Sequence, residues 1–292
     1  MLRSLLCLLA ILCLSTFAGA WWDPGHMTVA QIAYGRLTPE ARAQADALIA
    51  APITPGDERS NTFVTAACWA DDHKRSLNTG NWHYINVPFS LDGTELTTVT
   101  AKIAGYSFDV VRAIRLSTAM LQSTTATLEQ KAPYLRYLIH CVGDIHQPMH
   151  STTAVWADSP GGDAGGNGFT LAGDPRNLHA LWDSGAGWAA GEIFRPLDTT
   201  GEAILKGLAK DAEASLPYAA GPAGIVDPME WANESAILAR EKAYAGLTRG
   251  GAPSPEYLAE AQAIAKQRVA LAGYRLADLL NTILTEVPAA AH

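Results

Sequence analysis

Residues 140–150 read His-Cys-Val-Gly-Asp-Ile-His-Gln-Pro-Met-His, and this segment constrains the fold more than any other part of the chain. His140 and Asp144 are four residues apart, so on a helix both side chains project from one face, one turn above the other. Pro148 ends or kinks such a helix, and His150 therefore arrives from a different direction. Because potential metal ligands at this density rarely serve packing alone, the segment predicts a metal site.

The four-residue spacing returns at His179 and Asp183, in Asn-Leu-His-Ala-Leu-Trp-Asp. Two such pairs indicate more than one metal ion, and zinc sites in proteins favour histidine nitrogen with carboxylate oxygen. His26 and His83 extend the candidate set. His83 stands in the apolar sequence Trp-His-Tyr-Ile, where an unpaired imidazole would be unusual. Asp71 follows Trp-Ala on a segment that otherwise reads as buried, and it completes the candidates.

The remaining histidines, His73, His146 and His292, are not expected to bind metal. His146 lies in the ligand-rich segment but is two residues from Asp144, which places it on another helix face. His73 and the terminal His292 lie in no context that suits a ligand. The metal prediction therefore rests on the joint pattern of the remaining histidines and aspartates.

Residues 1–20 have the composition of an export leader rather than of a folded segment. Arg3 supplies a positive start, an apolar run follows, and a small-residue cleavage site ends at Ala20. The apolar run is too short to span a membrane. We therefore expect a signal peptide, and a mature chain over 21–292 that is soluble and secreted or periplasmic. Cleavage would free the α-amine of Trp21, whose ordinary pKa near 8 lets it bind a metal together with its own carbonyl oxygen.

The charge of the chain limits how it can bind nucleic acid. With 29 acidic and 21 basic residues, the formal net charge is −8. A protein this acidic is not expected to hold a polyanion through a broad basic surface. If it handles nucleic acid, the attraction must be local, and bound divalent cations could supply it.

Cys68 and Cys141 are the cysteines that remain once the leader is removed. Each lies close to a candidate ligand in the sequence, since Cys68 is three residues before Asp71 and Cys141 directly follows His140. An oxidising compartment permits one bridge, so a disulfide and two buried thiols are both open.

Hydrophobic periodicity predicts a single, mainly helical domain over 21–292 with little β-structure. The sequence Thr-Pro-Glu that starts at Thr38 has the order of a helix N-cap and first turn. Strands are expected at most as a short ribbon near 82–89 and at 168–172, and the glycine-rich segment 157–176 reads as a long functional loop. Helices are expected over 28–34, 38–50, 60–75, 97–122, 129–147, 177–184, 199–214, 228–245 and 254–286.

Several further motifs join these ligands along the chain: Trp21 with Gly25-His26, Trp69-Ala70-Asp71, His83-Tyr84-Ile85, the 140–150 segment, Gly165-Gly166-Asn167, Asn177-Leu178-His179, Asp183, Arg275-Leu276-Ala277 and Asn281. In this order they resemble the S1/P1 nuclease family, the secreted trinuclear-zinc nucleases that cut single-stranded nucleic acid. The match covers nearly all of 21–292. It implies the mainly α, multi-helix fold that this family shares with zinc-dependent phospholipase C.

The resemblance also implies three Zn²⁺ ions held by nitrogen and oxygen ligands, each with an open position for water or phosphate. One carboxylate, that of Asp144, would bridge two of the ions. The three ligand shells would be Asp71, His83, His140 and Asp144; the amine and carbonyl of Trp21 with His26 and Asp144; and His150, His179 and Asp183.

By the same resemblance, the protein is expected to hydrolyse single-stranded DNA and RNA to 5′-phosphates and to act on 3′-nucleotides. Zinc can activate water at neutral pH, so no side chain is required as a general acid. Asp71, Lys74 and Asp144 would form the catalytic centre, with Lys74 neutralising transition-state charge on the phosphate. We expect a monomer without a stable protein partner or a membrane anchor.

The resemblance further implies a base-binding pocket lined by Tyr84, Asn86 and Asn167. Base stacking tolerates sequence and requires an unpaired base, which fits single-stranded substrates. Asn86 departs from the aspartate that many members carry at this position. Because an amide both donates and accepts hydrogen bonds, whereas a carboxylate only accepts, the base preference stays open.

Two other functions compete with the nuclease. A zinc-dependent phospholipase C would need an apolar pocket open to lipid, whereas the polar Asn86 and Asn167 favour a nucleotide. A non-catalytic exported zinc-binding protein would hold metal without turnover, but a bridging carboxylate fits a hydrolytic centre better. Asn233 begins a glycosylation sequon that has meaning only in a eukaryotic source.

Overall fold

A computed structural model describes residues 21–219 and 227–285, so the expected leader 1–20 and His292 lie outside the described residues. Helices dominate, as predicted, and one small sheet has two strands. The elements in chain order are α1 (Asp23–Gly35), α2 (Pro39–Ala50), η1 (Glu58–Ser60), η2 (Thr65–Cys68), α3 (Trp69–His73), η3 (Gly80–His83), β1 (Val87–Ser90), α4 (Thr97–Ala104), α5 (Val110–Gln122), α6 (Leu128–His146), η4 (Pro148–Ser151), β2 (Thr152–Val155), α7 (Leu178–Asp183), α8 (Thr199–Ser215), α9 (Pro228–Leu238), η5 (Ala239–Ala243) and α10 (Pro255–Thr285).

Helix α6 lies at the centre of the molecule and carries the ligand-rich segment. It starts with a capping box, in which the Thr127 hydroxyl accepts from the Gln130 backbone N–H and the Gln130 side chain accepts from the Thr127 N–H. It ends at His146, because the residue before Pro148 is disfavoured in the helical conformation. Residues 135–146 are all buried, so this half of α6 has no solvent-facing side.

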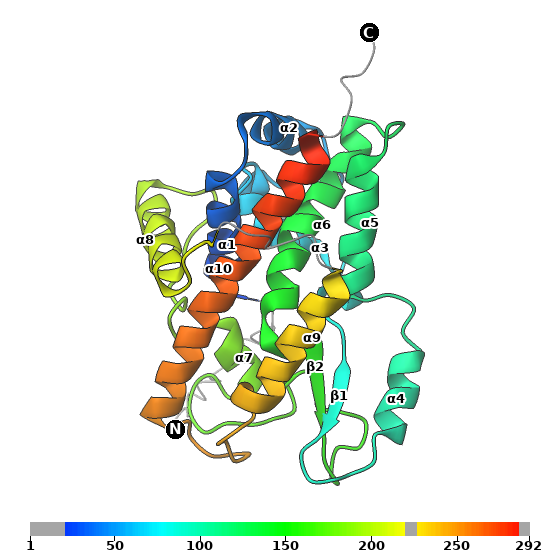
Figure 1. The fold of residues 1–292 in the computed structure, drawn as a ribbon, viewed down its shortest axis with the longest axis vertical. Helices are drawn as coiled ribbons and strands as arrows, with labels where there is room; N and C mark the ends of the chain where they lie inside the picture. The colour runs from blue at the N-terminus through cyan, green and yellow to red at the C-terminus, as the bar shows by residue number, and fades with distance from the viewer. Residues whose placement is uncertain (1–20, 220–226, 286–292) are drawn as a thin grey trace, which may run out of the picture.

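The other long helices surround α6. Helix α10 contacts α6 and also α1, α2, α5 and α8, and α5 packs along α6. Figure 1 shows α10 crossing the front of α6 diagonally, with α1 and α8 on one side and α5 and α9 on the other. The largest fully buried side chains include Trp21, Trp69, Trp182 and Trp231. Within the two described ranges, no helix combines the length and the apolar character needed to cross a membrane.

The sheet differs from the prediction. Strand β1 begins only at Val87, because 80–83 form a 3₁₀ turn, and it pairs in parallel with β2, which the sequence analysis did not predict. The segment 168–172 is not a strand; Thr170 makes only an isolated antiparallel bridge to Asn177. A strand of four residues, such as β2, gives too short a period for the sequence to reveal.

Three of the predicted helices are broken where the sequence analysis expected continuity. The expected helix over 97–122 is two helices, since Asp109 caps a new one through the Arg112 N–H. The expected helix over 60–75 consists mainly of 3₁₀ turns before the short α3. The expected helix over 228–245 changes to a π-turn at Ala239. The Thr38 cap is confirmed, with its hydroxyl accepting from the Ala41 N–H.

Candidate metal centre

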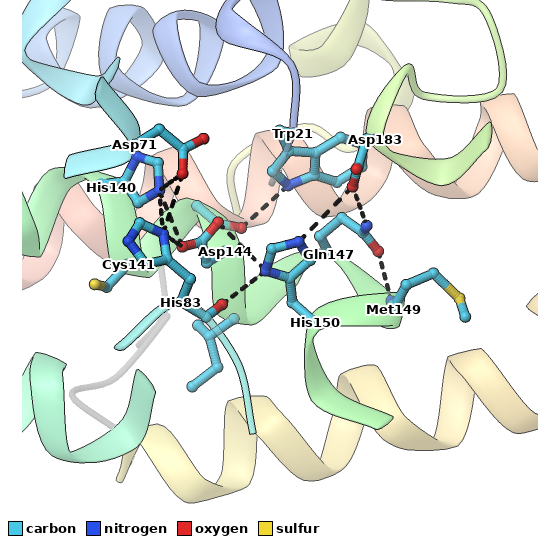
Figure 2. A network of polar contacts seen from close by, with 12 residues as sticks. Trp21, Asp71, His83, His140, Cys141, Asp144, Gln147, Met149, His150 and Asp183 are labelled. Carbon is cyan, nitrogen blue, oxygen red and sulfur yellow. Dashed lines mark hydrogen bonds and ion pairs between the residues drawn. The ribbon is translucent and has the colours of Figure 1, made fainter. Parts of the chain in front are cut away.

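The first group of ligands forms where α3 and η3 meet the C-terminal half of α6. His83 Nδ1 lies 2.9 Å from His140 Nε2, and each of these nitrogens lies 3.1 Å from Asp144 Oδ2. Asp71 Oδ1 is 3.4 Å from His83 Nδ1 and 3.7 Å from His140 Nε2. Figure 2 shows the four side chains directed at one another from three separate segments. This is the composition predicted for the first metal position.

His26 brings helix α1 to the same carboxylate. Its Nε2 lies 3.4 Å from Asp144 Oδ1, and its ring stacks on that of His140 with centroids 3.9 Å apart. The approach requires Gly143, because a Cβ at that position would lie 2.8 Å from His26 Nδ1. The two oxygens of Asp144 therefore face different histidines, as a bridging carboxylate would require.

Trp21 lies beside this group with its side chain in the core. Its indole N–H donates to the Gly143 carbonyl at 3.1 Å, and the backbone N–H of the next residue, Trp22, donates to the Asp183 carbonyl at 3.0 Å. Trp21 and Trp22 are thereby held between α6 and α7, and Figure 2 shows the indole of Trp21 beside the ligand groups. Coordination by the amine and carbonyl of Trp21 stays a prediction.

The third group joins η4 to α7. The Asn177 side chain caps α7 by accepting from the Ala180 N–H, and the helix then presents His179 and Asp183 on one face. His179 Nε2 lies 3.4 Å from Asp183 Oδ2, and His150 Nε2 lies 3.8 Å from Asp183 Oδ1. His150 also comes within 3.5 Å of Asp144 Oδ1 through its Nδ1, so the third group adjoins the first two.

Taken by geometry alone, the histidine and carboxylate atoms fall into three groups that could each hold a metal ion, with ligand atoms within 4.8 Å of one another. One group contains the full predicted shell of His150, His179 and Asp183, and another contains His83, His140 and Asp144 and lacks only Asp71 from its predicted shell. The remaining group places His26 with Asp71 and His140, because His140 lies between the two predicted positions. The groups are His83, His140 and Asp144; His150, His179 and Asp183; and His26, Asp71 and His140.

The donor set fits metal ions because its buried atoms lack other partners. Both oxygens of Asp144, Oδ2 of Asp183 and Nε2 of His26 and His150 are buried and have no hydrogen-bond partner among the described residues. A buried polar group without a partner costs about 1–3 kcal/mol. Here the unpaired atoms are chiefly acceptors that face one another, and only a cation satisfies such an arrangement.

Backbone carbonyls fix the tautomer of three ligands. His140 Nδ1–H donates to Ala67 O at 2.6 Å, and His150 Nδ1–H donates to His83 O at 2.7 Å. His179 Nδ1–H donates to Gly165 O at 2.7 Å. In each case Nε2 is the nitrogen that faces the ligand group, which is the usual arrangement around a metal-binding histidine.

The glycine-rich loop therefore orients a ligand. Gly165 has φ +64°, and a Cβ there would strike the Met149 carbonyl. Asp163 anchors the loop, because its carboxylate accepts from the Ala154 N–H at 2.9 Å and from the Tyr244 hydroxyl at 2.7 Å. The segment 157–176, predicted to be a functional loop, therefore contributes by holding the ring of His179 in place.

The electrostatics of the groups favour positive charge at Asp144. Burial alone would raise the pKa of this carboxyl, but the positive charges of His140 and His150 hold it well below its ordinary value. Burial would lower the pKa of His140, yet Asp144 and Asp71 raise it to about 9. Burial lowers the pKa of His26 to about 4, so its imidazole is neutral and available as a ligand near pH 7.

Gln147 is a functional residue that the sequence analysis missed. It is fully buried, and its amide N–H donates to Asp183 Oδ1 at 2.6 Å while its Oε1 accepts from the Met149 N–H at 2.5 Å. These two bonds, drawn in Figure 2, fix the direction of the amide. They leave Asp183 Oδ2 for His179. A polar residue immediately before Pro148, between two ligands, was the available signal.

A cavity of about 290 Å³ opens beside the ligand groups. His83, His150 and His179 form part of its wall. The predicted substrate residues Lys74, Tyr84, Asn86 and Asn167 all line it as well. Helix α4 and the turn after it add wall residues that the sequence did not suggest: Val99, Lys102, Ile103 and Tyr106.

Lys74 and Tyr84 are placed by contacts to the ligand groups. Lys74 Nζ donates to Asp71 Oδ1 at 2.9 Å. Tyr84 is held between two bonds that join its segment to His150, because the next residue, Ile85, donates its backbone N–H to the His150 carbonyl at 2.8 Å. The candidate ligand His83 and the next residue, Tyr84, therefore lie side by side in the cavity wall.

The residues set aside by the sequence analysis lie outside the three groups. His146 turns to the opposite side of α6, where its Nδ1–H donates to Val142 O at 2.7 Å. His73 Nε2 lies 3.6 Å from Asp57 instead. The sequon residue Asn233 is exposed on α9, but the hydroxyl of its Ser235 is buried and donates to Ile145 O.

Cys68 and Cys141 are free and buried, which resolves the alternative that the sequence left open. The Cys68 thiol contacts the Asp23 carbonyl at 3.9 Å, whereas the Cys141 thiol contacts the Trp82 carbonyl at 3.6 Å. Burial raises the pKa of both thiols well above the ordinary value, so they are unreactive. The disulfide bond is not formed.

Three adjacent groups of nitrogen and oxygen ligands on a helical scaffold, with open space beside them, define the class of metal-dependent hydrolases that use more than one ion. The S1/P1 Nuclease family model matches residues 21–285, and the chain belongs to this family.

Its relatives agree with this assignment. The chain is 28% identical over 299 residues to Nuclease S1 of Aspergillus oryzae, which covers 95% of this chain and 96% of that protein. It is 27% identical over 289 residues to Endonuclease 4 of Arabidopsis thaliana, covering 92% and 90%. It is 29% identical over 170 residues to Nuclease P1 of Penicillium citrinum, covering 56% and 57%. The predicted family and mainly helical fold are confirmed.

Proposed function

We propose that residues 21–292 act as a secreted or periplasmic, single-domain endonuclease that cuts single-stranded DNA and RNA and leaves 5′-phosphates. The same site would remove the 3′-phosphate of 3′-nucleotides, since this also breaks a bond to a 3′-oxygen. One observation carries the proposal: His83, His150 and His179 belong both to the ligand groups and to the wall of the cavity. A phosphate in the cavity would therefore lie beside the metal positions.

Three Zn²⁺ ions would occupy the three predicted ligand shells. Asp144 would belong to two of them, His26 to the second and Asp183 to the third, and Trp21 would complete the shell of His26 through its freed amine. When bound, zinc supplies Lewis-acid charge and lowers the pKa of a coordinated water. The chain orients the ligands for this task through the carbonyls of Ala67, His83 and Gly165, and through the amide of Gln147.

Lys74 would bind a non-bridging oxygen of the scissile phosphate. Its ammonium group has three N–H donors, and only one is directed at Asp71. The remaining donors face a cavity that also contacts the ligand groups. Lys74→Ala is expected to lower kcat by about 10- to 100-fold, because one charge-stabilising contact in the transition state is lost. Unchanged kcat and zinc content would show that Lys74 is only a solvated lysine.

Tyr84, Asn86 and Asn167 would hold the base. The Tyr84 ring offers a stacking surface, and stacking needs a base that is free of its partner strand. The Asn86 amide can donate to or accept from a base edge, and the Asn167 amide donates to Ala164 O at 2.8 Å while its side chain lines the cavity. Duplex DNA would be a poor substrate for this reason.

A substrate panel tests the function. The chain beginning at Trp21 is incubated with single-stranded DNA, RNA, duplex DNA, 3′-AMP and phosphatidylcholine vesicles, with zinc and after chelation. We expect zinc-dependent cleavage of both single strands to 5′-phosphates and release of phosphate from 3′-AMP. Cleavage of phosphatidylcholine alone would favour a phospholipase, and stable zinc binding without any turnover would favour a binding protein.

A further inference from the structure

The charged side chains that line the cavity are all cationic. Lys74 and Lys102 are the lysines in its wall, and no aspartate or glutamate of the described residues lines it. The chain as a whole has a net charge of −8. A cationic cavity in an acidic protein is a local feature that favours anions with more than one negative charge.

Lys102 is fixed at a different part of the wall from Lys74. Lys74 contacts the ligand Asp71, whereas Lys102 Nζ donates to the Gly161 carbonyl of the glycine-rich loop at 3.1 Å. Gly161 also lines the cavity. Within the described residues, no carboxylate lies at ion-pair distance from Lys102, so its charge is not neutralised by a partner in the protein.

Helix α4 is anchored well enough to position this lysine. Val99, one turn before Lys102, is 1% exposed, and it packs against Gly162 in the turn that follows Gly161. Figure 1 shows α4 outside the central bundle, at the end of the molecule that carries β1 and β2. The helix therefore serves chiefly to close the cavity rather than to build the core.

We propose that Lys102 binds the phosphate on the 5′ side of the nucleotide whose base fills the pocket. The inference rests on the proposed function. A 3′-nucleotide offers one nucleoside, so the base held at Tyr84 and Asn86 belongs to the nucleotide whose 3′-oxygen leaves the phosphorus and becomes a free hydroxyl. The next phosphate along the strand is the 5′-phosphate of that nucleotide. Lys102 has two N–H donors left after its bond to Gly161, and these bind the phosphate oxygens.

This assignment makes Lys102 a determinant of preference for a strand over a mononucleotide. Lys74 and the metal positions contact the scissile phosphate in every substrate. Lys102 contacts a phosphate that only a strand, or a 5′-phosphorylated dinucleotide, contains. The contact affects binding of the extended substrate and leaves the bond-breaking step unchanged.

The test compares the dinucleotide ApA with its 5′-phosphorylated form pApA on zinc-loaded protein. For the wild type, we expect a KM for pApA about 5- to 10-fold below that for ApA, as one charge-assisted hydrogen bond provides. Lys102→Ala should raise the KM for pApA to that for ApA, with both kcat values, the KM for ApA and the zinc content unchanged. Lys102→Arg should keep the preference, because it keeps the charge.

Lys206→Ala is the matched control, since Lys206 is an exposed lysine of α8 and its loss changes the net charge equally. On oligothymidylate, the slope of log KM against log salt concentration should fall by about 0.7 for Lys102→Ala and not for Lys206→Ala. The proposal is wrong if Lys102→Ala raises both KM values equally or changes neither. If the wild type hydrolyses neither dinucleotide although it is folded and zinc-loaded, the proposed nuclease function itself fails and this inference fails with it.

Discussion

The C-terminal end of α6 carries buried polar side chains on two opposite faces. On only one of these faces does the protein supply arginine side chains that pair with them. On the first face, His140 and Asp144 meet other histidines and aspartates. On the second face, His146 meets Arg275 and Arg268 from α10. His140, Asp144 and His146 are all fully buried, so the difference between the two faces of α6 lies in charge and not in solvent exposure.

The second face is closed by its own hydrogen bonds. Arg275 donates from NH1 to His146 Nε2 at 2.9 Å and makes two bonds to Glu234 at 2.7 and 2.8 Å. Arg268 donates to the His146 carbonyl at 3.1 Å, which satisfies one of the last carbonyls of α6. Burial and the two arginines lower the pKa of His146 well below its ordinary value, so it remains a neutral acceptor.

The first face has acceptors but almost no donors. Both oxygens of Asp144 are buried without a hydrogen-bond partner among the described residues, and Lys74 contacts the group only at its edge, through Asp71. The contrast shows how one helix end can support both structure and chemistry. Where arginine supplies the charge the cluster is structural, and where it does not the cluster requires a metal ion.

The largest expected effect is on the first face. Asp144→Asn removes the charge shared by two metal positions, and activity should fall by about 10³-fold or more because several kcal/mol of metal-dependent stabilisation are lost. Zinc content should fall as well, measured by atomic emission on dialysed protein.

Asp174→Asn is the control for this variant, because Asp174 is an exposed aspartate of the glycine-rich segment. It should keep both activity and zinc. Full zinc content and full activity in Asp144→Asn would contradict the idea that this face is incomplete without a metal ion.

The second face should respond in the opposite way. Arg275→Leu leaves His146 and Glu234 without their main donor, and the free energy of unfolding should fall by about 2 kcal/mol. The figure is kept low because the Glu234 side chain is 39% exposed and water can replace part of the lost contact. Urea denaturation of the chelated protein measures it, and zinc content of the folded variant should be unchanged.

Arg240→Leu is the matched control, because Arg240 is exposed and pairs only with its neighbour Glu241. Its effect should be close to zero. If Arg275→Leu lost zinc at temperatures where it is folded, the second face would also affect metal binding, and the comparison of a structural face with a metal-binding face would fail.

A smaller effect is expected from Gln147, which links the end of α6 to the third group. Gln147→Leu removes the donor to Asp183 Oδ1 but keeps the size of the side chain. Zinc affinity at the third position should fall by about 10- to 100-fold, as is typical for loss of a partner of a metal ligand. Competition with a chromophoric chelator would resolve the weakened ion from the other two.

Gln262→Leu provides the comparison for this variant, since the Gln262 amide donates to the Ala186 carbonyl and touches no ligand. Excess zinc should restore activity to Gln147→Leu. Tight binding of all zinc in Gln147→Leu would show that the amide does not position Asp183.

The sequence predicted the parts of this site that depend on local spacing. His140 with Asp144 and His179 with Asp183 lie four apart, and helices place each pair on one face as expected. Pro148 ends α6 as predicted. The leader had already suggested Trp21, and the resemblance added the grouping of shells. Spacing alone could not provide that grouping, because His26 and Asp71 approach α6 from separate helices.

The sequence could not predict features that depend on tertiary contact. The role of Gln147 depends on Asp183, which lies in another helix, and β2 pairs with a strand far along the chain. The break between α4 and α5 follows from a single cap at Asp109, within a segment whose periodicity reads as continuous. The sequence did not indicate that Lys102 lines the cavity, because this depends on where α4 packs.

The zinc content of two chains tests the central claim most directly. One chain begins at Trp21, and the other carries two additional alanines before Trp21, so that its amine is displaced from His26. Native mass spectrometry should find three zinc ions in the first chain and two in the second, with much lower nuclease activity in the second. Equal zinc content and equal activity in the two chains, or fewer than three ions in the first, would contradict the account.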